Sequence, residues 1–310
     1  MPNQRIVNSA KIIHAQALKE KGSSVYLAIG SGSSSWDTEI QVNKTFVGDQ
    51  FTLIPTNAYA DQVKLYLLNT LSTQYVSGID FLFDTETGIC TRLAGGAIAS
   101  NATVTVVYKA IGLVTAGQTQ LVAEVGRRRA SLSYAVVDNV NGSYLINGTK
   151  YSISANPTEF LLATVTFPEG ELTGTSIRES GLFFSVVPDL TSYTVTRTFT
   201  TSKIVVDTDI QNGYKTANNV VVKSQNLATT YVAGTDYILD AETSEIWRLP
   251  TGAITGGQVV SVTYEKIASE LLLPGDITDI GTLYLAKTAP TINKLAGAFY
   301  TDTFLIQLTR

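Results

Sequence analysis

The sequence predicts a mainly β protein: a discontinuous, sandwich-like β-rich core with an N-terminal helix and two small, mutually homologous β-sandwich modules inserted into it. Three observations support this class. The 310 residues are rich in Thr, Val, Tyr, Ile and Gly, which favours strands over helices. One segment is repeated within the chain, and its apolar residues alternate with polar ones, as in strands with one buried face. A hydrophobic fraction of 44% against 15% charged residues excludes a wholly disordered chain.

The internal repeat is the most informative of these features. Residues 75–108 match residues 231–264 at 15 of 34 positions without a gap, 156 positions further along the chain. Each copy ends in the same alternation of Val, Val and Tyr, which predicts a strand with one face buried. We therefore predict two antiparallel β-modules of one fold, at 41–110 and at 191–266.

The remaining residues predict one core domain made of three discontinuous segments, 1–40, 111–190 and 267–310. The ends of an inserted module usually lie close together, so the segments on either side of it can belong to one domain. We interpret the repeat as one module that was inserted twice into a β-rich core.

The first predicted element is an amphipathic helix. Its apolar residues recur at helical spacing and share one face, flanked by Val7 and Leu18: Ile6, Ala10, Ile13 and Ala17. Gly22 is placed to end this helix, with Lys19 and Lys21 in the last turn.

Strands and turns follow in order. A strand at 24–30 leads into a polar loop at 31–39, and Asn147-Gly148 between apolar segments predicts a tight hairpin. Further strands are predicted at the following segments: 159–167, 176–184, 281–287 and 298–308. In the first module, the turn from Asp84 predicts a positive φ at Gly88; the second copy has Ser244 there, which predicts a less ideal turn.

Charge and cysteine content exclude several classes of partner. The net charge of −4 and a pI near 5.1 give no electrostatic footprint for nucleic acid. The basic run 127–129 is interpreted as a solvated strand edge or a local ion-pair site. No apolar run approaches the ~20 residues of a membrane span, and no signal peptide is recognised. Cys90 is alone, so no internal disulfide can form and folding in a cytosol is expected.

The sequence offers no constellation of catalytic, metal-ligating or cofactor-binding residues. With one histidine and one cysteine, neither a zinc cluster nor a Ser-His-Asp triad is expected. His14 is interpreted as a partly buried structural residue, and Gly30 with Gly32 as a tight turn rather than a phosphate loop. Acidic pairs such as Glu169 with Glu171 are interpreted as solvated turns. We therefore expect no enzyme, no cofactor and no metal site.

Two segments resemble proteins of known role. The segment 25–39, "VYLAIGSGSSSWDTE", resembles a region near the N-terminus of baseplate wedge and related tail proteins of contractile-tailed bacteriophages. Its matching residues are Ala28, Ile29, Gly30, Trp36 and Asp37. A second tail-protein motif resembles "TSIRESGLFF", through Ile177, Arg178, Glu179, Gly181, Leu182 and Phe183. The Pro-rich stretch that usually follows Trp-Asp in that family is absent.

The resemblance implies a non-enzymatic virion structural protein in the tail baseplate, assembled in the host cytoplasm and bound to other tail and baseplate proteins. The modules look like the immunoglobulin-like domains that decorate many phage virion proteins. The candidate interface residues are Trp36, Asp37, Arg178 and Glu179. From the residues alone, Trp36 is either a core anchor or an interface residue, and Arg178 with Glu179 is more simply an internal ion pair.

Further expectations concern assembly and alternative functions. A homo-oligomer, most simply a dimer, is expected to form through the core and the N-terminal helix. One alternative is a tail-fibre-attaching or glycan-binding protein of the virion surface. Against glycan binding, the copies show no cluster of aromatics at matched exposed positions, since Trp247 aligns with Thr91. The weakest alternative is a glycosidase, supported only by acidic residues in turns.

Overall fold

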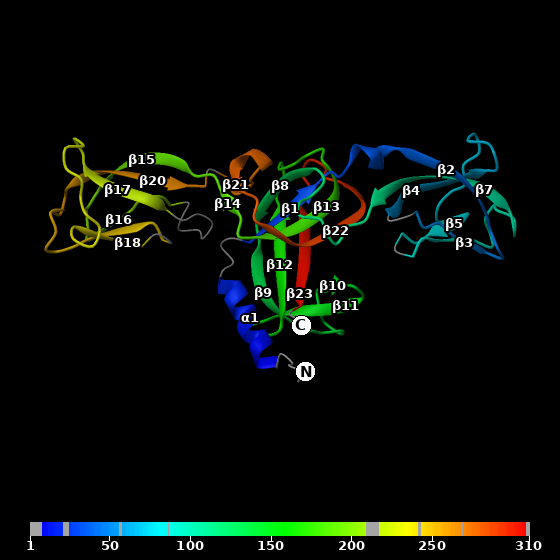
Figure 1. The fold of residues 1–310 in the computed structure, drawn as a ribbon, viewed down its shortest axis with the longest axis horizontal. Coiled ribbons are helices and arrows are strands. Elements are labelled where there is room, and N and C mark those ends of the chain that lie inside the picture. Colours follow the sequence, from blue (N-terminus) through cyan, green and yellow to red (C-terminus); the bar gives the residue numbers. More distant parts are fainter. Residues whose placement is uncertain are drawn as a thin grey trace. The chain divides into compact units, whose positions relative to one another are not determined.

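The computed structural model describes residues 8–20, 25–55, 58–85, 87–208, 217–240, 243–267 and 269–307 (Figure 1). Strands account for 52% of the structure and helices for 6%, which confirms the predicted mainly β class. The chain divides into two compact units, Met1–Val186 with Gly281–Arg310, and Val187–Ile280.

Two antiparallel sheets form the core of the first unit. The four-stranded sheet has the order β22-β13-β1-β8 and the five-stranded sheet the order β10-β11-β9-β12-β23. The strands of the first sheet are β1 (Tyr26–Gly30), β8 (Glu124–Arg129), β13 (Ser176–Phe184) and β22 (Thr282–Asn293). Those of the second are β9 (Ser131–Val137), β10 (Tyr144–Ile146), β11 (Thr149–Ser154), β12 (Phe160–Phe167) and β23 (Tyr300–Gln307).

Strand β1 is the centre of the first sheet. All five of its residues are buried, and β13 and β8 pair with it on either side. Its apolar sequence, Tyr-Leu-Ala-Ile-Gly, fits a strand that has no solvent face. The predicted hairpin at Asn147-Gly148 is confirmed: the two residues have φ of 49° and 77°, as a two-residue hairpin turn requires.

Helix α1 (Asn8–Glu20) packs on β9 and β12 through a different face from the predicted apolar stripe. Ala15 is fully buried, and the ammonium of Lys19 lies 4.1 Å from the ring centroid of Tyr134. Ile13 is 61% exposed and Ala17 is exposed too. The helix therefore packs on the sheet through the side that carries Ala15 and Lys19. The aliphatic part of a lysine can cover apolar surface while its ammonium group remains in contact with water.

The predicted environment of His14 is wrong, since its side chain is exposed on α1. It follows Ile13 on the side of the helix that faces away from the sheet. Ile6, Val7, Lys21 and the helix-ending Gly22 lie outside the described residues.

The basic run lies on β8, an edge strand of the first sheet. Arg127 is only 1% exposed; it pairs with Glu124 at 2.7 Å, and its guanidinium lies 4.2 Å from the ring centroid of Phe183. Arg128 pairs with Glu171 at 2.6 Å. Of the two interpretations, the local ion-pair site is confirmed and the solvated edge is wrong for Arg127.

The first repeat folds as two three-stranded antiparallel sheets, β2-β7-β4 and β3-β6-β5. Buried residues between them, among them Phe46, Leu65 and Phe81, form its own hydrophobic core. The strands are β2 (Glu39–Thr45), β3 (Gln50–Thr52), β4 (Ala58–Leu67), β5 (Phe81–Phe83), β6 (Ile89–Arg92) and β7 (Thr103–Gly112). We call this region the first module.

The second repeat has the same topology, with sheets β15-β20-β17 and β16-β19-β18. Its separate core includes Phe199, Val222 and Ile246. The strands are β15 (Thr191–Thr198), β16 (Lys203–Val205), β17 (Asn218–Ser224), β18 (Tyr237–Asp240), β19 (Glu245–Arg248) and β20 (Val259–Lys266). We call this region the second module. In the same unit, β14 (Val187–Pro188) pairs with β21 (Ile277–Asp279), which follows the short 3-10 helix η4 (Pro274–Asp276).

A buried aspartate explains part of the repeated sequence. The carboxylate of Asp80 accepts hydrogen bonds from the backbone N–H groups of Val76 and Ala97, both at 2.7 Å. Asp236 accepts the equivalent two bonds, both at 2.8 Å. These bonds lower the pKa of both carboxyls, those from Ala97 and Ala253 being the strongest. The identical aspartate is therefore a structural clamp that joins two segments of each module.

The expected positive φ at Gly88 is confirmed: in the turn between β5 and β6 it is +67°. Ser244 adopts +55° in the second module, a conformation that costs a residue with a side chain more than it costs glycine. The Ser244 hydroxyl donates to the backbone oxygen of Asp207 at 2.7 Å. This buried hydrogen bond offsets part of the cost of the less ideal turn.

The strands of the first module run from Glu39 to Gly112, and those of the second from Thr191 to Lys266. The first module is grouped with the core in one compact unit, whereas the second module belongs to the other unit together with β14, η4 and β21. The division into a core at 1–40, 111–190 and 267–310 with modules at 41–110 and 191–266 stays a prediction about domains.

Candidate functional site

Trp36 lies in a short 3-10 helix, η2 (Ser34–Asp37), between β1 and β2. Ser33 caps this turn by accepting a hydrogen bond from the N–H of Ser35 at 3.2 Å. A Cβ atom on Gly32 would lie only 2.0 Å from the Trp36 ring, and one on Gly112 would lie 3.2 Å from its Nε1. The ring is half-buried against two glycines, one after β1 and one at the end of β7.

Asp37 and Arg178 are brought together by the fold. The Arg178 guanidinium donates a hydrogen bond to Asp37, and Lys109 on β7 lies 3.6 Å from the same carboxylate. The side chain of Arg178 is 7% exposed and that of Asp37 is 56% exposed. The bond from Arg178 lowers the pKa of the Asp37 carboxyl, and Lys109 adds to this effect. The arrangement keeps the carboxylate ionised at neutral pH.

The network continues from Arg178 into the first module. Arg178 Nε donates to the Thr291 hydroxyl on β22 at 3.1 Å. That hydroxyl in turn donates to Asp61 on β4 at 2.7 Å, and the Thr291 N–H donates to the same carboxylate oxygen at 3.2 Å. Asp61 is 6% exposed. The core strands β13 and β22 are therefore joined by hydrogen bonds to β4 of the first module and, through Asp37, to β7.

Glu179 has a separate role from its neighbour, because adjacent strand residues point to opposite faces. Its buried carboxylate accepts hydrogen bonds from the N–H groups of Val122 and Ala123 at 3.0 and 2.8 Å. A Cβ on Gly30 would lie 2.5 Å from a Glu179 oxygen, so glycine at this position leaves room for the carboxylate. Glu179 holds the segment that leads into β8.

Of the four predicted interface residues, the structure brings three together: Trp36 and Asp37 in η2, and Arg178 beside them. The internal ion pair forms between Arg178 and Asp37, while Glu179 binds backbone N–H groups. Arg178 and Glu179 are buried. The exposed part of this site consists of Asp37 and part of the Trp36 ring. We call Trp36, Asp37, Arg178, Thr291 and Asp61 the junction cluster.

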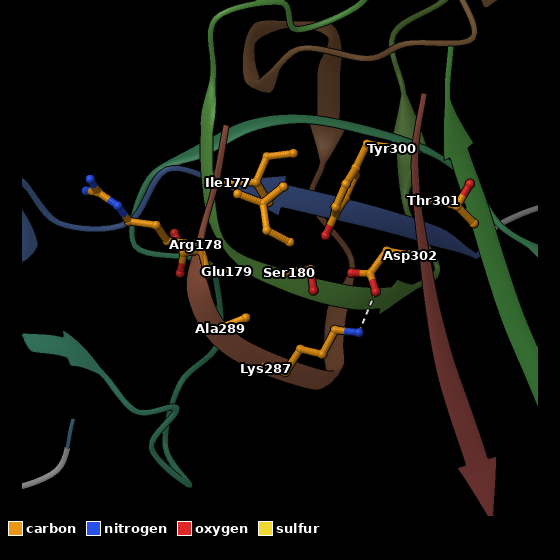
Figure 2. A pocket seen from close by; sticks show the side chains of 10 residues that line it. Ile177, Arg178, Glu179, Ser180, Lys287, Ala289, Tyr300, Thr301 and Asp302 are labelled. Atoms are coloured by element: carbon orange, nitrogen blue, oxygen red, sulfur yellow. Dashed lines mark hydrogen bonds and ion pairs between the residues drawn. The ribbon is translucent and has the colours of Figure 1, made fainter. Parts of the chain in front are cut away.

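A cavity of about 240 Å³ lies next to this cluster, between β13, β22 and β23. Figure 2 shows Lys287 and Asp302 pointing toward one another in an ion pair across it, with Tyr300 directed into the same space. Asp302 is 6% exposed, and its Oδ1 also accepts from the N–H of Thr303 at 2.8 Å. Within the described residues, Asp302 Oδ2 has no hydrogen-bond partner.

Burial and the neighbouring Asp302 raise the pKa of the Tyr300 hydroxyl, which therefore stays protonated. Tyr300 takes part in this site through hydrogen bonds and not as a charged group. The cavity can hold water or a small polar molecule beside an acceptor, a donor and an ammonium. Among the described residues, no group of three or more His, Cys, Asp or Glu side chains could hold a metal ion.

Sequence reasoning missed Asp61, Thr291, Lys287 and Asp302. One signal was available: Asp302 occupies an inward position of β23 in line with Phe304 and Ile306, where an apolar residue is expected. Asp61 gave no comparable signal, because its partner Thr291 is 230 positions away.

Comparison with known proteins adds one match. A family model described as "protein of unknown function UCP028589" matches residues 180–272, a range that contains the six strands of the second module. No curated protein matches the chain. In the described part of the chain, no helix has the length and apolar character needed to cross a membrane.

Proposed function

We propose that this chain is a non-enzymatic structural protein of a phage virion, a baseplate wedge component of a contractile tail that is assembled in the host cytoplasm. The observation that supports this best is the meeting of the two segments that resemble tail proteins. Asp37 of the Trp-Asp segment and Arg178 of the Ile-Arg-Glu segment are 141 positions apart, yet they form one ion pair. The two resemblances thus belong to one structural feature.

The duplicated module also supports an assembly role. Two copies of one β-sandwich, each with its own hydrophobic core, add exposed surface to the chain. Repeated use of one fold with diverged exterior residues suits a protein that contacts different neighbours. The proposed partners are other tail and baseplate proteins.

The test is the composition of the particle. Tailed particles are purified from lysates of cells that carry the whole phage genome, and their proteins are identified by mass spectrometry. We expect this chain in the purified particles, and cryo-electron microscopy should place its two modules in the baseplate density. A chain that stays in the soluble lysate while the particles are complete would contradict the proposal.

The second candidate function is glycan binding or fibre attachment by the second module. The observation in its favour is Trp247 on the outer face of β19, which is 41% exposed and lies across from Ile238 on β18. Aromatic rings at a surface are common contact residues for partners. The test compares binding of the full chain and of Trp247→Ala to a glycan array and to purified fibre proteins; equal binding would remove this candidate.

The proposed oligomer is a dimer formed through the core and α1. The exposed Ile13 gives this helix an apolar position that faces away from its own sheet. We expect light scattering to report twice the 33.3 kDa chain mass at micromolar concentration, and Ile13→Asp to reduce it. A wild-type chain that stays at the monomer mass would contradict the dimer.

A further inference from the structure

One lysine–carboxylate pair in the second module is buried on both sides. Lys266, the last residue of β20, donates to Asp207, and their side chains are 8% and 9% exposed. In the other lysine–carboxylate pairs that the structure describes, at least one side chain is 30% or more exposed. The pair therefore combines an amine and a carboxyl group in contact with little water around either.

The surroundings of the pair fix both groups. The Tyr264 hydroxyl donates to Asp207 Oδ2 at 2.7 Å, the same oxygen that accepts from Lys266. The ring centroid of Tyr193 lies 4.9 Å from Lys266 Nζ, and this ring stacks on that of Tyr264 at 5.8 Å. The backbone of Asp207 is held by Ser244, whose hydroxyl is bonded to both its N–H and its carbonyl. The carboxyl group is thus presented to the amine in one orientation.

The module fold does not require this pair, because the first module lacks it. Ala110 stands where Lys266 does, at the offset of 156 residues that relates the repeats. Ile54 stands where Asp207 does. The N–H of Leu53 donates to the carbonyl oxygen of Gly88, and the N–H of Val206 donates to that of Ser244, so Leu53 and Val206 are equivalent and so are the residues that follow them. A buried ion pair is often no more stabilising than apolar residues of similar size. The pair in the second module therefore calls for a reason other than the stability of the fold.

We propose that Lys266 and Asp207 condense into an intramolecular amide cross-link between β20 and the segment that follows β16. Within the pair, the ammonium first passes a proton to the carboxylate, which gives a neutral amine and a neutral acid. A site with little water favours this neutral form over two buried charges. Held contact between the reacting groups replaces the encounter that would limit the reaction in solution.

The bond changes balance without any further reactant. Nζ of the neutral amine attacks Asp207 Cγ, and a C–N bond forms while one C–O bond of the acid breaks. The leaving oxygen takes the acid proton and one amine hydrogen and departs as water. One ammonium and one carboxylate become one amide and one water, with no change of oxidation state. The Tyr264 hydroxyl donates to the carboxyl oxygen as charge builds on it and is unchanged at the end.

The cross-link would close a loop across 59 positions of the chain and tie the last strand of the second module to its interior. A covalent closure of this kind limits the unfolded chain in the same way as a disulfide, and it does so without cysteine. It goes beyond the proposed role in the virion and is independent of it.

The experiment is intact-protein mass spectrometry of the purified full chain. We expect a mass lower than that of the sequence by one water, and no tryptic cleavage after Lys266, because trypsin does not cut at an acylated lysine. The peptide that contains Lys266 should be recovered joined to the one that contains Asp207. Tyr264→Phe should slow formation of the linked species during the hours after purification, and the mass of the folded chain reports this directly.

Three variants keep the test decisive. Lys266→Arg retains the charge and should show the full sequence mass. The double variant Lys266→Ala with Asp207→Ile places the residues of the first module in the second; it should fold and show no loss of water. Lys287→Ala removes the ion pair with Asp302, in which the lysine is 43% exposed, and should leave the loss of water in place.

Two results would overturn the proposal. A folded wild-type chain that keeps the full sequence mass after prolonged incubation would show an ordinary buried ion pair. A loss of water that persists in Lys266→Arg would place the dehydration elsewhere in the chain.

Discussion

The two modules share one topology but differ in the residues at one matching position of their strand pairing. In the first module, Asp61 stands opposite Lys109 in the pairing of β4 with β7, and both belong to interactions that reach the core through Thr291 and Asp37. In the second, Asn218 stands opposite Glu265 at the matching place in the pairing of β17 with β20. A lysine has become a glutamate and an aspartate an asparagine. Interior residues and turns specify the shared fold. The residues at these end positions are not needed for it and can form different contacts in each copy.

The largest expected effect comes from the matched core aromatics Phe81 and Tyr237, which are 2% and 3% exposed. Truncating either to alanine should cost about 3–5 kcal/mol, because a large cavity is left in a small core. Each variant should unfold its own module at lower denaturant concentration and leave the other module unchanged, as measured by hydrogen exchange. Loss of protection in both modules from one substitution would show that they do not fold as separate cores.

Arg178→Ala should break the junction cluster and loosen the first module and the core strand β22, while leaving the second module unchanged. The change leaves Thr291 and Asp37 without their buried donor, for which we expect a loss of about 1–3 kcal/mol. Hydrogen exchange should rise in β4 and β22 and stay constant in the second module. Arg129→Ala, on an edge strand of the same core, is the matched control for the loss of an arginine. Unchanged exchange in β4 would contradict the proposed link.

Acid should weaken both modules through the same clamp. The folded-state pKa values of Asp80 and Asp236 are lowered, so their contribution to stability is fully present above the unfolded pKa of about 3.9. It is lost as the pH falls from about 4 through the lower folded values. Thermal unfolding between pH 5 and pH 2 should show this loss in the wild type.

Asp80→Asn and Asp236→Asn separate the clamp from other acid effects. Each variant should lower the melting temperature of its module by several degrees at neutral pH and flatten the acid dependence for that module. An asparagine variant with the wild-type acid profile would show that other carboxyls are responsible.

The smallest expected effect concerns the turns. Gly88→Ser should destabilise the first module by roughly 1–2 kcal/mol, since a Cβ there would lie 2.6 Å from the Leu53 carbonyl oxygen and φ is positive. Ser244→Gly should change the second module by less than about 1 kcal/mol, because relief of the backbone cost opposes loss of the bond to Asp207. Chemical denaturation of both variants gives the comparison, and equal losses would contradict it.

Most of the fold was predictable from local patterns in the sequence. The strands at 159–167 and 176–184, the Asn147-Gly148 hairpin and the repeated module were predictable because alternation and turn residues act over a few positions. The face of α1 that packs on the sheet was not predictable. Whether Ile13 or Ala15 is buried depends on which surface of β9 and β12 is available to the helix.

The candidate site was predictable only in part. Trp36, Asp37, Arg178 and Glu179 were named from short motifs, but nothing in the sequence paired Asp37 with Arg178 or Asp61 with Thr291. Such contacts depend on how strands far apart in the chain are brought together, and pattern within a segment does not encode that. The pairing of Lys287 with Asp302 was missed for the same reason, although the polar residue at an inward position of β23 marked Asp302 itself.

The repeat has a consequence for synthesis on the ribosome. A chain that contains two copies of one topology can pair β7 with strands of the wrong copy, and exchange of equivalent strands is a characteristic failure of repeated domains. The strands of the first module end at Gly112, so they are all made before Thr191 emerges. The aligned segments have diverged to 15 identities in 34 positions, with Trp247 in place of Thr91, and the next position has Glu265 in place of Lys109. These differences make each strand a poor substitute for its counterpart. Sequence divergence between the copies would therefore help each module to find its own strands.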